Sequence, residues 1–289
     1  MPPASGGGQP GRAALWMLGA VVALTAMAVA GRELSAELST FQILFFRSLI
    51  GLVVIGVLVQ RTGWSRVRTH RLGAHAARNL AHFAGQYGWF LGIALIPLTE
   101  VFAIEFTTPM WTAVFAALLL RERLTPLRVA GTVVGFLGTI VILRPGVDAV
   151  SLGALSVLGA ALAYAFAHTM TKRLSSTESP LSILFYMSAL QLPLGLLPAL
   201  VRGWVWPSIP AWPWVLVVSL CGLLGHYCLA RAFRLADASV VVPIDFVRLP
   251  LVAALGYLLY REPLDPWVTI GAAIVVAGTW LTLRSARVK

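Results

Sequence analysis

Charged side chains are scarce in this sequence. Asp, Glu, Lys and Arg together make up 11% of the 289 residues, whereas hydrophobic residues make up 58%. A water-soluble domain of this length needs far more polar surface than so few charges supply. The composition therefore excludes an ordinary soluble protein and favours one whose solvent is largely lipid.

Cysteine is almost absent as well. The two cysteines, Cys221 and Cys228, form no CxxC pair and no zinc-type spacing. We interpret them as packing residues of one helix, and we expect no metal site.

Motifs of the common enzyme classes are also missing. The sequence contains no HExxH, no GxSxG, no glycine-rich phosphate loop and no clustered pair of carboxylates. Their absence argues against ATP hydrolysis and a bound cofactor, and it leaves an intramembrane enzyme as the weaker alternative.

The sequence does contain about ten runs of roughly 20 mainly apolar residues, the length of a helix that crosses a bilayer. They fall near 13–31, 41–60, 72–95, 99–120, 127–143, 152–171, 181–201, 212–234, 239–260 and 267–284. We therefore predict an all-α integral membrane protein with ten transmembrane helices.

Basic residues set the expected orientation. The net charge of +11 comes from Arg and Lys in short loops between the runs, and such residues collect on the cytoplasmic side of membrane proteins. A cytoplasmic N-terminus leaves only Arg32, Arg144, Arg202 and Arg261 outside. We predict that both termini are cytoplasmic, in a bacterial-type inner membrane.

The chain opens with MPPASGGGQPG, a composition that predicts a disordered cytoplasmic tail over residues 1–12. Ala28-Val29-Ala30, at the end of the first run, also resembles a signal-peptidase site. We favour an uncleaved first helix because the repeat described next requires it.

An internal repeat shows at RERLTP (121–126) and REPLDP (261–266), which stand 140 residues apart in a gapless self-alignment. The same offset pairs Ile104-Glu105-Phe106 with Ile244-Asp245-Phe246, and Gly85-Gln86-Tyr87 with Gly225-His226-Tyr227. A constant offset through charged and aromatic positions indicates a duplication, with repeats over 13–145 and 146–289.

Five spans in each repeat make the two repeats inverted, because an odd number forces the second to enter the membrane from the opposite face. Exchanging the conformations of two inverted halves exchanges which side is open, and secondary transporters use this geometry for alternating access. A duplicated channel or enzyme scaffold is the alternative.

Each repeat ends in a proline-bearing helix, an Arg-Glu turn and a glycine-rich helix: EFTTPMWTAVFAALLLRERLTPLRVAGTVVGFLGTIVIL and DFVRLPLVAALGYLLYREPLDPWVTIGAAIVVAGTWLTL. With the five-plus-five repeat and Arg47 in LFFRSLIG, this resembles the drug/metabolite transporter superfamily, specifically its ten-helix EamA-type members, over the whole chain after the tail. Within that family it is most similar to the YddG-type exporters of aromatic and other neutral amino acids.

The resemblance implies that helices one, three, four, six, eight and nine surround a central cavity, while five and ten brace the outside. The sequence agrees, because helices five and ten carry few polar side chains. Their glycines suit close helix packing or a face for a second copy of the chain. These are Gly131, Gly135, Gly138, Gly271 and Gly278.

Polar side chains inside a bilayer are costly and usually face a cavity or a partner. Arg78, His82 and Gln86 recur every four residues on the third run, with the last two near the midplane. We expect Arg78 to reach the cytoplasmic surface. The expected substrate-binding residues combine such polar groups with aromatic walls: His82, Gln86, Trp89, Trp111, Tyr164, His168, His226 and Tyr227. A network between helices without a ligand is the alternative.

Buried charges need partners. Arg47 and Glu105 lie at equal depth below the outer membrane surface, which predicts an ion pair between them. In the second repeat Asp245 matches Glu105 but Met187 replaces Arg47, so we expect Arg248, one turn along, to pair with Asp245. We also hypothesise that Asp245, Arg248 and His168 form an inner cluster that titrates or changes partners between two states.

Pro109 and Pro250 fall near the middle of helices four and nine. Each removes a backbone donor, which predicts a kink. The freed carbonyls, those of Glu105 and Phe246, are expected to offer acceptors beside the cavity. Kinks that serve packing alone are the alternative.

The combined expectation is a secondary transporter that exports small metabolites, with aromatic and neutral amino acids first. Sugars, nucleosides and drug-like solutes are the alternative substrates, and the outward direction is implied by the resemblance alone. The expected partners are the solute and the lipid bilayer, with no nucleic acid.

Overall fold

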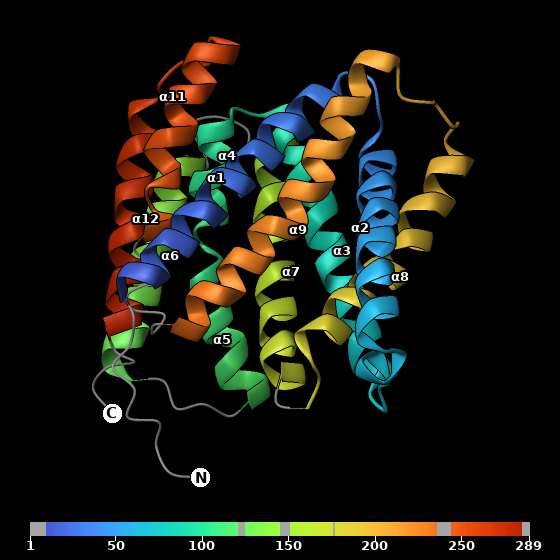
Figure 1. Cartoon of the computed structure of the whole chain (residues 1–289). Helices are drawn as coiled ribbons and strands as arrows, with labels where there is room; N and C mark the ends of the chain where they lie inside the picture. The colour runs from blue at the N-terminus through green and yellow to red at the C-terminus, as the bar shows by residue number, and fades with distance from the viewer. Residues whose placement is uncertain (1–9, 121–124, 145–150, 176, 236–243, 285–289) are drawn as a thin grey trace.

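A computed structural model describes residues 10–120, 125–144, 151–175, 177–235 and 244–284. Every regular element in these ranges is helical (Figure 1). The α-helices are α1 (Pro10–Ser35), α2 (Thr40–Thr62), α3 (Leu72–Leu95), α4 (Leu98–Glu105), α5 (Thr108–Leu120), α6 (Pro126–Leu143), α7 (Leu152–Ser175), α8 (Pro180–Val201), α9 (Trp212–Leu235), α11 (Arg248–Tyr260) and α12 (Pro266–Arg284). Two short 3-10 turns, η1 (Trp64–Val67) and η2 (Ile209–Ala211), lie in connections.

Several helices begin where the sequence supplies a cap or a proline. Ser39 precedes α2, and its hydroxyl accepts the Gln42 N–H while the Gln42 side chain accepts the Ser39 N–H, which is a capping box. Prolines open α6, α8 and α12, where their fixed backbone and missing N–H cost nothing.

Length and composition make this an integral membrane protein. Six helical segments within the described ranges are long and apolar enough to cross a membrane, and each of the ten expected runs contains helix. Large apolar side chains such as Leu15, Val53 and Leu118 are exposed on the outside, where lipid would cover them. α3 falls outside the six because its buried polar side chains lower its hydropathy. The all-α membrane fold is confirmed.

The helices pack as a two-fold arrangement predicts. Under the 140-residue offset, α1 corresponds to α7, α2 to α8, α3 to α9, and α6 to α12. The most extensive contacts are α1 with α9 and α7 with α3, an exchanged pair, and α2 with α8 and α6 with α12, each helix meeting its own counterpart. Figure 1 places the α2–α8 and α6–α12 pairs on opposite sides of the bundle, so the pseudo-two-fold axis runs between them.

Glycines set the contact between α6 and α12. A Cβ at Gly271 would lie 2.7 Å from the Gly138 carbonyl oxygen, and one at Gly278 would lie 2.6 Å from that of Gly131. Because the later Gly278 meets the earlier Gly131, while Gly271 meets Gly138, the two helices run antiparallel, as inverted repeats require. These glycines therefore serve packing within the chain.

The fourth and ninth spans are interrupted. α4 ends at Glu105 and α5 begins at Thr108, and α11 begins at Arg248 after a turn at Phe246 and Val247. The expected free carbonyls are not available. The Thr108 hydroxyl donates to the Glu105 carbonyl oxygen at 2.6 Å, and the Leu249 N–H donates to that of Phe246 at 3.1 Å. Each break thus satisfies its own backbone groups.

Candidate functional site

We call the two ends of the bundle the terminal end, where α1 begins and α12 ends, and the far end, where α1 ends and α12 begins. The third span, α3, carries the polar face expected from its sequence. Its side chains His75, Arg78, Asn79, His82 and Gln86 are all buried inside the bundle. The expectation that Arg78 reaches the surface is wrong. It is 6% exposed, and its guanidinium donates to Thr171 on α7 at 3.1 Å and to Asn79 at 2.7 Å.

Imidazole and phenol rings meet at the centre of the bundle. The His82 ring lies 5.5 Å from that of Tyr164 and 5.9 Å from that of His226, so α3, α7 and α9 converge here. His168, one turn along α7, stacks parallel to Tyr164 at 6.2 Å and is itself exposed. An exposed imidazole so close to the buried His82 indicates a space reached from outside the protein.

Gln191 of α8 joins this ring cluster. Its amide nitrogen lies 3.0 Å from His82 Nδ1 and 3.4 Å from the side-chain oxygen of Asn79. Gln86 is buried next along α3, and its side-chain oxygen has no hydrogen-bond partner among the described residues. We call His82, Gln86, Tyr164, His168, His226 and Gln191 the central polar cluster.

Three expected site residues lie elsewhere. Tyr227 is half exposed on an outer stripe of α9, with its ring against Trp16 of α1. Trp111 packs its ring on Phe136 of α6 at 4.4 Å. Trp89 is buried and donates its indole N–H to Glu105 at 2.8 Å. Trp89 therefore positions a charged group, while Tyr227 faces outward.

Three charges meet where α4 and α11 pack together. The Arg248 guanidinium lies 2.9 Å from Asp245 and 3.7 Å from Glu105, and it covers the rings of Phe102 and Phe106. Glu105 and Asp245 are equivalent under the repeat. The guanidinium is thus shared between two carboxyl groups, one from each repeat. We call Glu105, Asp245 and Arg248 the charge triad.

The charge triad corrects two expectations. Arg47 does not pair with Glu105, because α2 packs on α8 and α9 while Glu105 faces α3 and α11. Equal depth in the membrane does not bring Arg47 and Glu105 together, since α2 and α4 do not pack closely on each other. His168 is not part of the charge triad either: within the described ranges, no hydrogen bond or ion pair joins it to Asp245 or Arg248.

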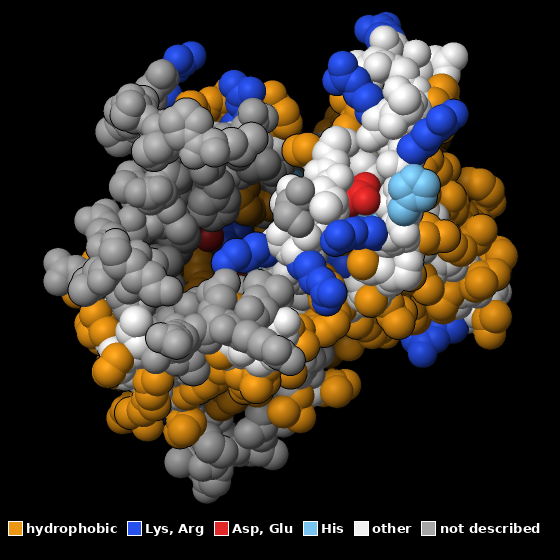
Figure 2. All heavy atoms as spheres, turned by 90° about the horizontal axis from the view of Figure 1, so that it is seen from below, with side chains coloured by type: hydrophobic (Ala, Val, Ile, Leu, Met, Phe, Trp, Pro, Cys, Tyr) orange, Lys and Arg blue, Asp and Glu red, His pale blue; other side chains and the backbone are white. Residues whose placement is uncertain are grey.

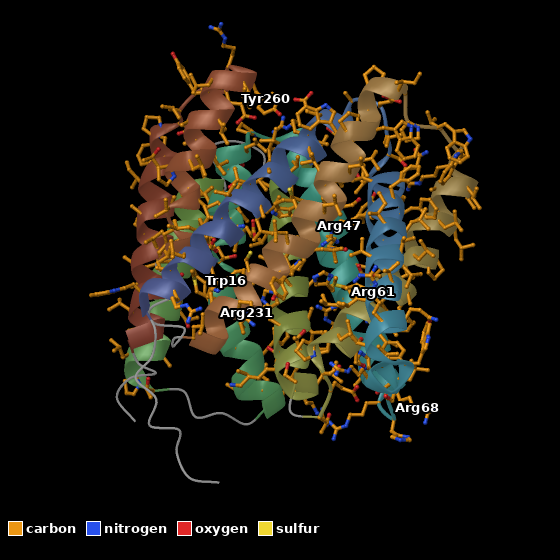
Figure 3. The ribbon with its side chains drawn as sticks, viewed as in Figure 1. Trp16, Arg47, Arg61, Arg68, Arg231 and Tyr260 are labelled. Atoms are coloured by element: carbon orange, nitrogen blue, oxygen red, sulfur yellow. The ribbon has the colours of Figure 1, made fainter. Side chains whose placement is uncertain are left out.

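Arg47 instead borders a small polar cavity between α2, α8 and α9, about halfway along the bundle (Figure 3). The cavity has room for about one water molecule. It is lined by Arg47, Ser48, Met187, Ser188, Gln191, Ser219 and Leu223.

The far end of the bundle is closed by a buried network. Arg32 of α1 pairs with Glu262 at 3.0 Å and donates to the Ile96 carbonyl oxygen at 2.5 Å. The second carboxylate oxygen of Glu262 accepts the Leu98 N–H at 2.9 Å. Helices of both repeats, α1 and α4 on one side and the segment after α11 on the other, are thereby tied together. We call Arg32, Ile96, Leu98 and Glu262 the far-end network.

The terminal end is hollowed. Figure 2 looks onto this end and shows a hollow between the helices, with acidic and basic side chains visible inside it. Glu105 and Asp245 retain partial exposure, 19% and 21% of their side chains, which fits a charge triad that borders this space.

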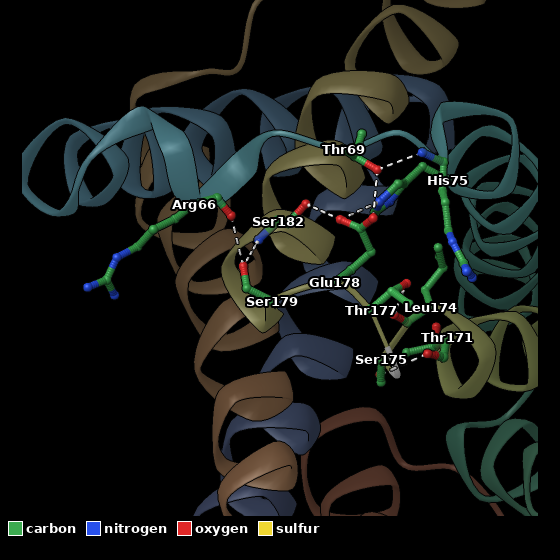
Figure 4. A network of polar contacts seen from close by, with 11 residues as sticks. Arg66, Thr69, His75, Thr171, Leu174, Ser175, Thr177, Glu178, Ser179 and Ser182 are labelled. Atoms are coloured by element: carbon green, nitrogen blue, oxygen red, sulfur yellow. Dashed lines mark hydrogen bonds and ion pairs between the residues drawn. The ribbon is translucent and has the colours of Figure 1, made fainter.

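A separate polar network holds the loops at the terminal end (Figure 4). Glu178, between α7 and α8, accepts from Thr69 at 2.7 Å and from Ser182 at 3.1 Å, and lies 3.6 Å from His75. Burial raises the pKa of Glu178, but these hydrogen bonds and the imidazole outweigh it and leave the pKa below its usual value. The carboxylate joins loops of the two repeats.

Sequence reasoning missed Gln191, the far-end network and the small cavity. Gln191 carried a usable signal, since it is an amide inside an apolar run. Arg32 and Glu262 belong to the loops between runs, where charges are ordinary, so nothing in the sequence marked them as buried partners.

A broken-helix bundle with a two-fold axis, one closed end and buried polar groups at its centre is the arrangement expected of an inverted-repeat membrane transporter. A family model described as the EamA-like transporter family matches residues 11–144 and again 151–284. The chain belongs to that family.

Several proteins with named transport functions are similar to this chain over most of its length. A riboflavin transporter of Vibrio cholerae is 30% identical, covering 96% of each chain. An S-adenosylmethionine uptake transporter of Rickettsia bellii is 28% identical over 94% of this chain and 93% of its own. The pseudopaline exporter CntI of Pseudomonas aeruginosa is 28% identical over 85% and 86%. A solved structure with 19% identity shares the fold, with a TM-score of 0.67 over 95% of this chain and 97% of that one.

Proposed function

We propose that this protein is a secondary transporter that moves a small organic solute across the bacterial inner membrane by alternating access. The observation that carries the proposal is the asymmetry between the ends: the far-end network seals one side while the other is hollowed toward buried polar groups. Exchanging the conformations of two related halves would open the far end and close the terminal end.

Solute binding falls to the central polar cluster, with the charge triad beside it. Trp89 of α3 links α3, which carries His82 and Gln86, to the charge triad, because its indole N–H donates to Glu105 at 2.8 Å. The excess of basic residues in the loops on the terminal side favours cytoplasmic termini, and in that orientation the hollow faces inward. We assign no enzymatic step and no cofactor to this proposed binding site.

The first candidate substrates are aromatic and other neutral amino acids, moved outward. Imidazole and phenol rings with a few polar groups suit an amphipathic solute of that size. The similar proteins include both an uptake transporter and an exporter, so the direction of transport is part of the proposal.

S-adenosylmethionine is the second candidate. It is an amino acid with an added sulfonium, and the charge triad offers two carboxyl groups to a single guanidinium, an arrangement that could accept a further cationic centre. The similar protein of Rickettsia bellii is named as an uptake transporter for this solute.

Counterflow in proteoliposomes tests the proposal. Vesicles holding an unlabelled solute are diluted into the labelled one, and transient accumulation marks exchange. We expect accumulation with neutral amino acids or S-adenosylmethionine above protein-free vesicles. If only riboflavin, sugars or nucleosides exchange, the substrate class is wrong, and if nothing exchanges, transport itself is wrong.

A further inference from the structure

Arg47 is a buried cation without a counter-charge. It is 6% exposed, and among the residues that the structure describes none accepts a hydrogen bond from its guanidinium or forms an ion pair with it. Arg78 and Arg248, the other buried arginines of the core, both have such partners. A guanidinium stays charged in proteins, and leaving it unpaired in a low-dielectric interior is costly. Such a group indicates a missing anion.

The side chains around Arg47 suit an anion. Ser48 and Ser188 bring hydroxyl groups to the same small cavity, and Gln191 brings an amide, while the Ser219 hydroxyl donates to the Val215 carbonyl oxygen at 2.7 Å. Gly222 makes room for the guanidinium, since a Cβ there would lie 2.8 Å from Arg47 Nε. Among the cavity's lining residues, none is acidic.

The cavity also lies on the pseudo-two-fold axis. Arg47 and Met187 are equivalent under the 140-residue offset, as are Ser48 and Ser188, and all four line the cavity from α2 and α8. Substrate sites of inverted-repeat transporters lie at the repeat interface near the midplane. Because methionine replaces arginine in the second copy, this interface holds one guanidinium and not a repelling pair.

The cavity adjoins the central polar cluster through Gln191. Gln191 lines the cavity and also contacts His82, whose ring meets Tyr164 and His226. At the other end of the axis lies the charge triad, where α4 packs on α11. The path from Arg47 to Glu105 therefore runs from a positive end, past rings, to a negative end.

We infer that the Arg47 cavity is the subsite for the carboxylate of the transported solute and selects solutes that bear one. This inference rests on the proposed transport function. The carboxylate would bind the guanidinium and the hydroxyls of Ser48 and Ser188. A carboxylate is larger than the present space, so Met187, a flexible unbranched side chain, changes rotamer to admit it.

Counterflow with matched probes tests selection. The probes are L-phenylalanine and L-phenylalaninamide, which differ only in the carboxylate. We expect wild type to exchange the acid about tenfold faster or more, a factor that corresponds to one charge-assisted contact. Arg47→Gln should lose this preference, and Arg47→Lys should keep part of it. Equal exchange of both probes by wild type, or an unchanged preference in Arg47→Gln, overturns the inference.

A binding measurement separates the subsite from transport. Thermal unfolding of the purified protein is followed with acetate and with acetamide as minimal probes. We expect acetate alone to raise the Tm of wild type and of Arg202→Gln, a control that removes an exposed arginine, but not that of Arg47→Gln. Acetate stabilisation without transport would keep the subsite and reject the proposed function. Equal effects of acetate and acetamide, or the same acetate response in Arg47→Gln, would reject the subsite.

Discussion

Asp245 and Glu105 occupy equivalent positions in the two repeats and both lie against the guanidinium of Arg248, at 2.9 Å and 3.7 Å. One arginine from the second repeat thus binds a carboxylate from each half. Any rearrangement that separates the halves must change this contact, so the charge triad links the solute chamber to the motion of the repeats.

Removing Arg248 tests how the charge triad stabilises the fold. In Arg248→Gln two carboxylates face each other with no cation, and breaking a buried pair in this way costs about 3–5 kcal/mol. We expect a clearly lower Tm in detergent. Adding Glu105→Gln to this variant should recover part of the loss, since only one carboxylate then remains. If the double variant is as unstable as the sum of both single variants, the three charges do not act together.

The α6–α12 crossing gives a second prediction. In Gly271→Ala the new Cβ would lie 2.6 Å from Ile142 Cγ1 and 2.7 Å from the Gly138 carbonyl oxygen, so the helices must separate. We expect a loss of about 1–3 kcal/mol, measured as a lower Tm. Gly159→Ala is the matched control because nothing lies within 4 Å of its Cβ, and it should be neutral or slightly stabilising. Equal behaviour of the two variants would contradict the close crossing.

The far-end network gives a third prediction. Glu262→Gln removes the charge that holds Arg32 and weakens the acceptor of the Leu98 N–H, a cost of about 1–3 kcal/mol. The far end should then open more often, and a cysteine introduced at the buried Ile96 should react about tenfold faster with an impermeant maleimide.

Asp265→Asn is the control for that labelling. It breaks an ion pair with Arg144 at the same end, but both side chains are about one third exposed and the pair is worth little. Similar labelling of Ile96→Cys in both backgrounds would show that Glu262 has no special part in closing the far end.

The terminal-end loops give a pH prediction. The folded pKa of Glu178 lies below its usual value, so the ionised carboxylate stabilises the fold above the ordinary glutamate pKa of about 4.3. That contribution disappears as the pH falls through the folded pKa. We expect the Tm of wild type to exceed that of Glu178→Gln at pH 7, and the difference to shrink below pH 4. A difference that is constant with pH would contradict the hydrogen-bonded carboxylate.

The sequence predicted the membrane class, the repeat and the helix runs well, because apolar length and a constant offset are local properties of the chain. It located His82, Tyr164 and His226 by their polarity within apolar runs, and the structure brings them together. It failed for Arg47, because membrane depth can be counted from sequence but helix neighbours cannot. It failed for Tyr227 because polarity does not tell which side of a helix faces lipid.

The backbone at the two proline positions shows another limit. Pro109 and Pro250 marked the interrupted spans, yet Thr108 and Leu249 take the carbonyls that the prolines leave free. A missing donor can be read from a sequence, whereas the group that replaces it depends on the local turn.

Cross-linking the far end tests alternating access most directly. Arg32→Cys and Glu262→Cys, in a chain whose Cys221 and Cys228 are replaced by serine, are joined by a short bismaleimide, and counterflow of the best-exchanged amino acid is measured before and after. We predict that exchange stops on cross-linking but continues when either single-cysteine variant is treated in the same way. Continued exchange at an undiminished rate with the far end cross-linked would contradict the account.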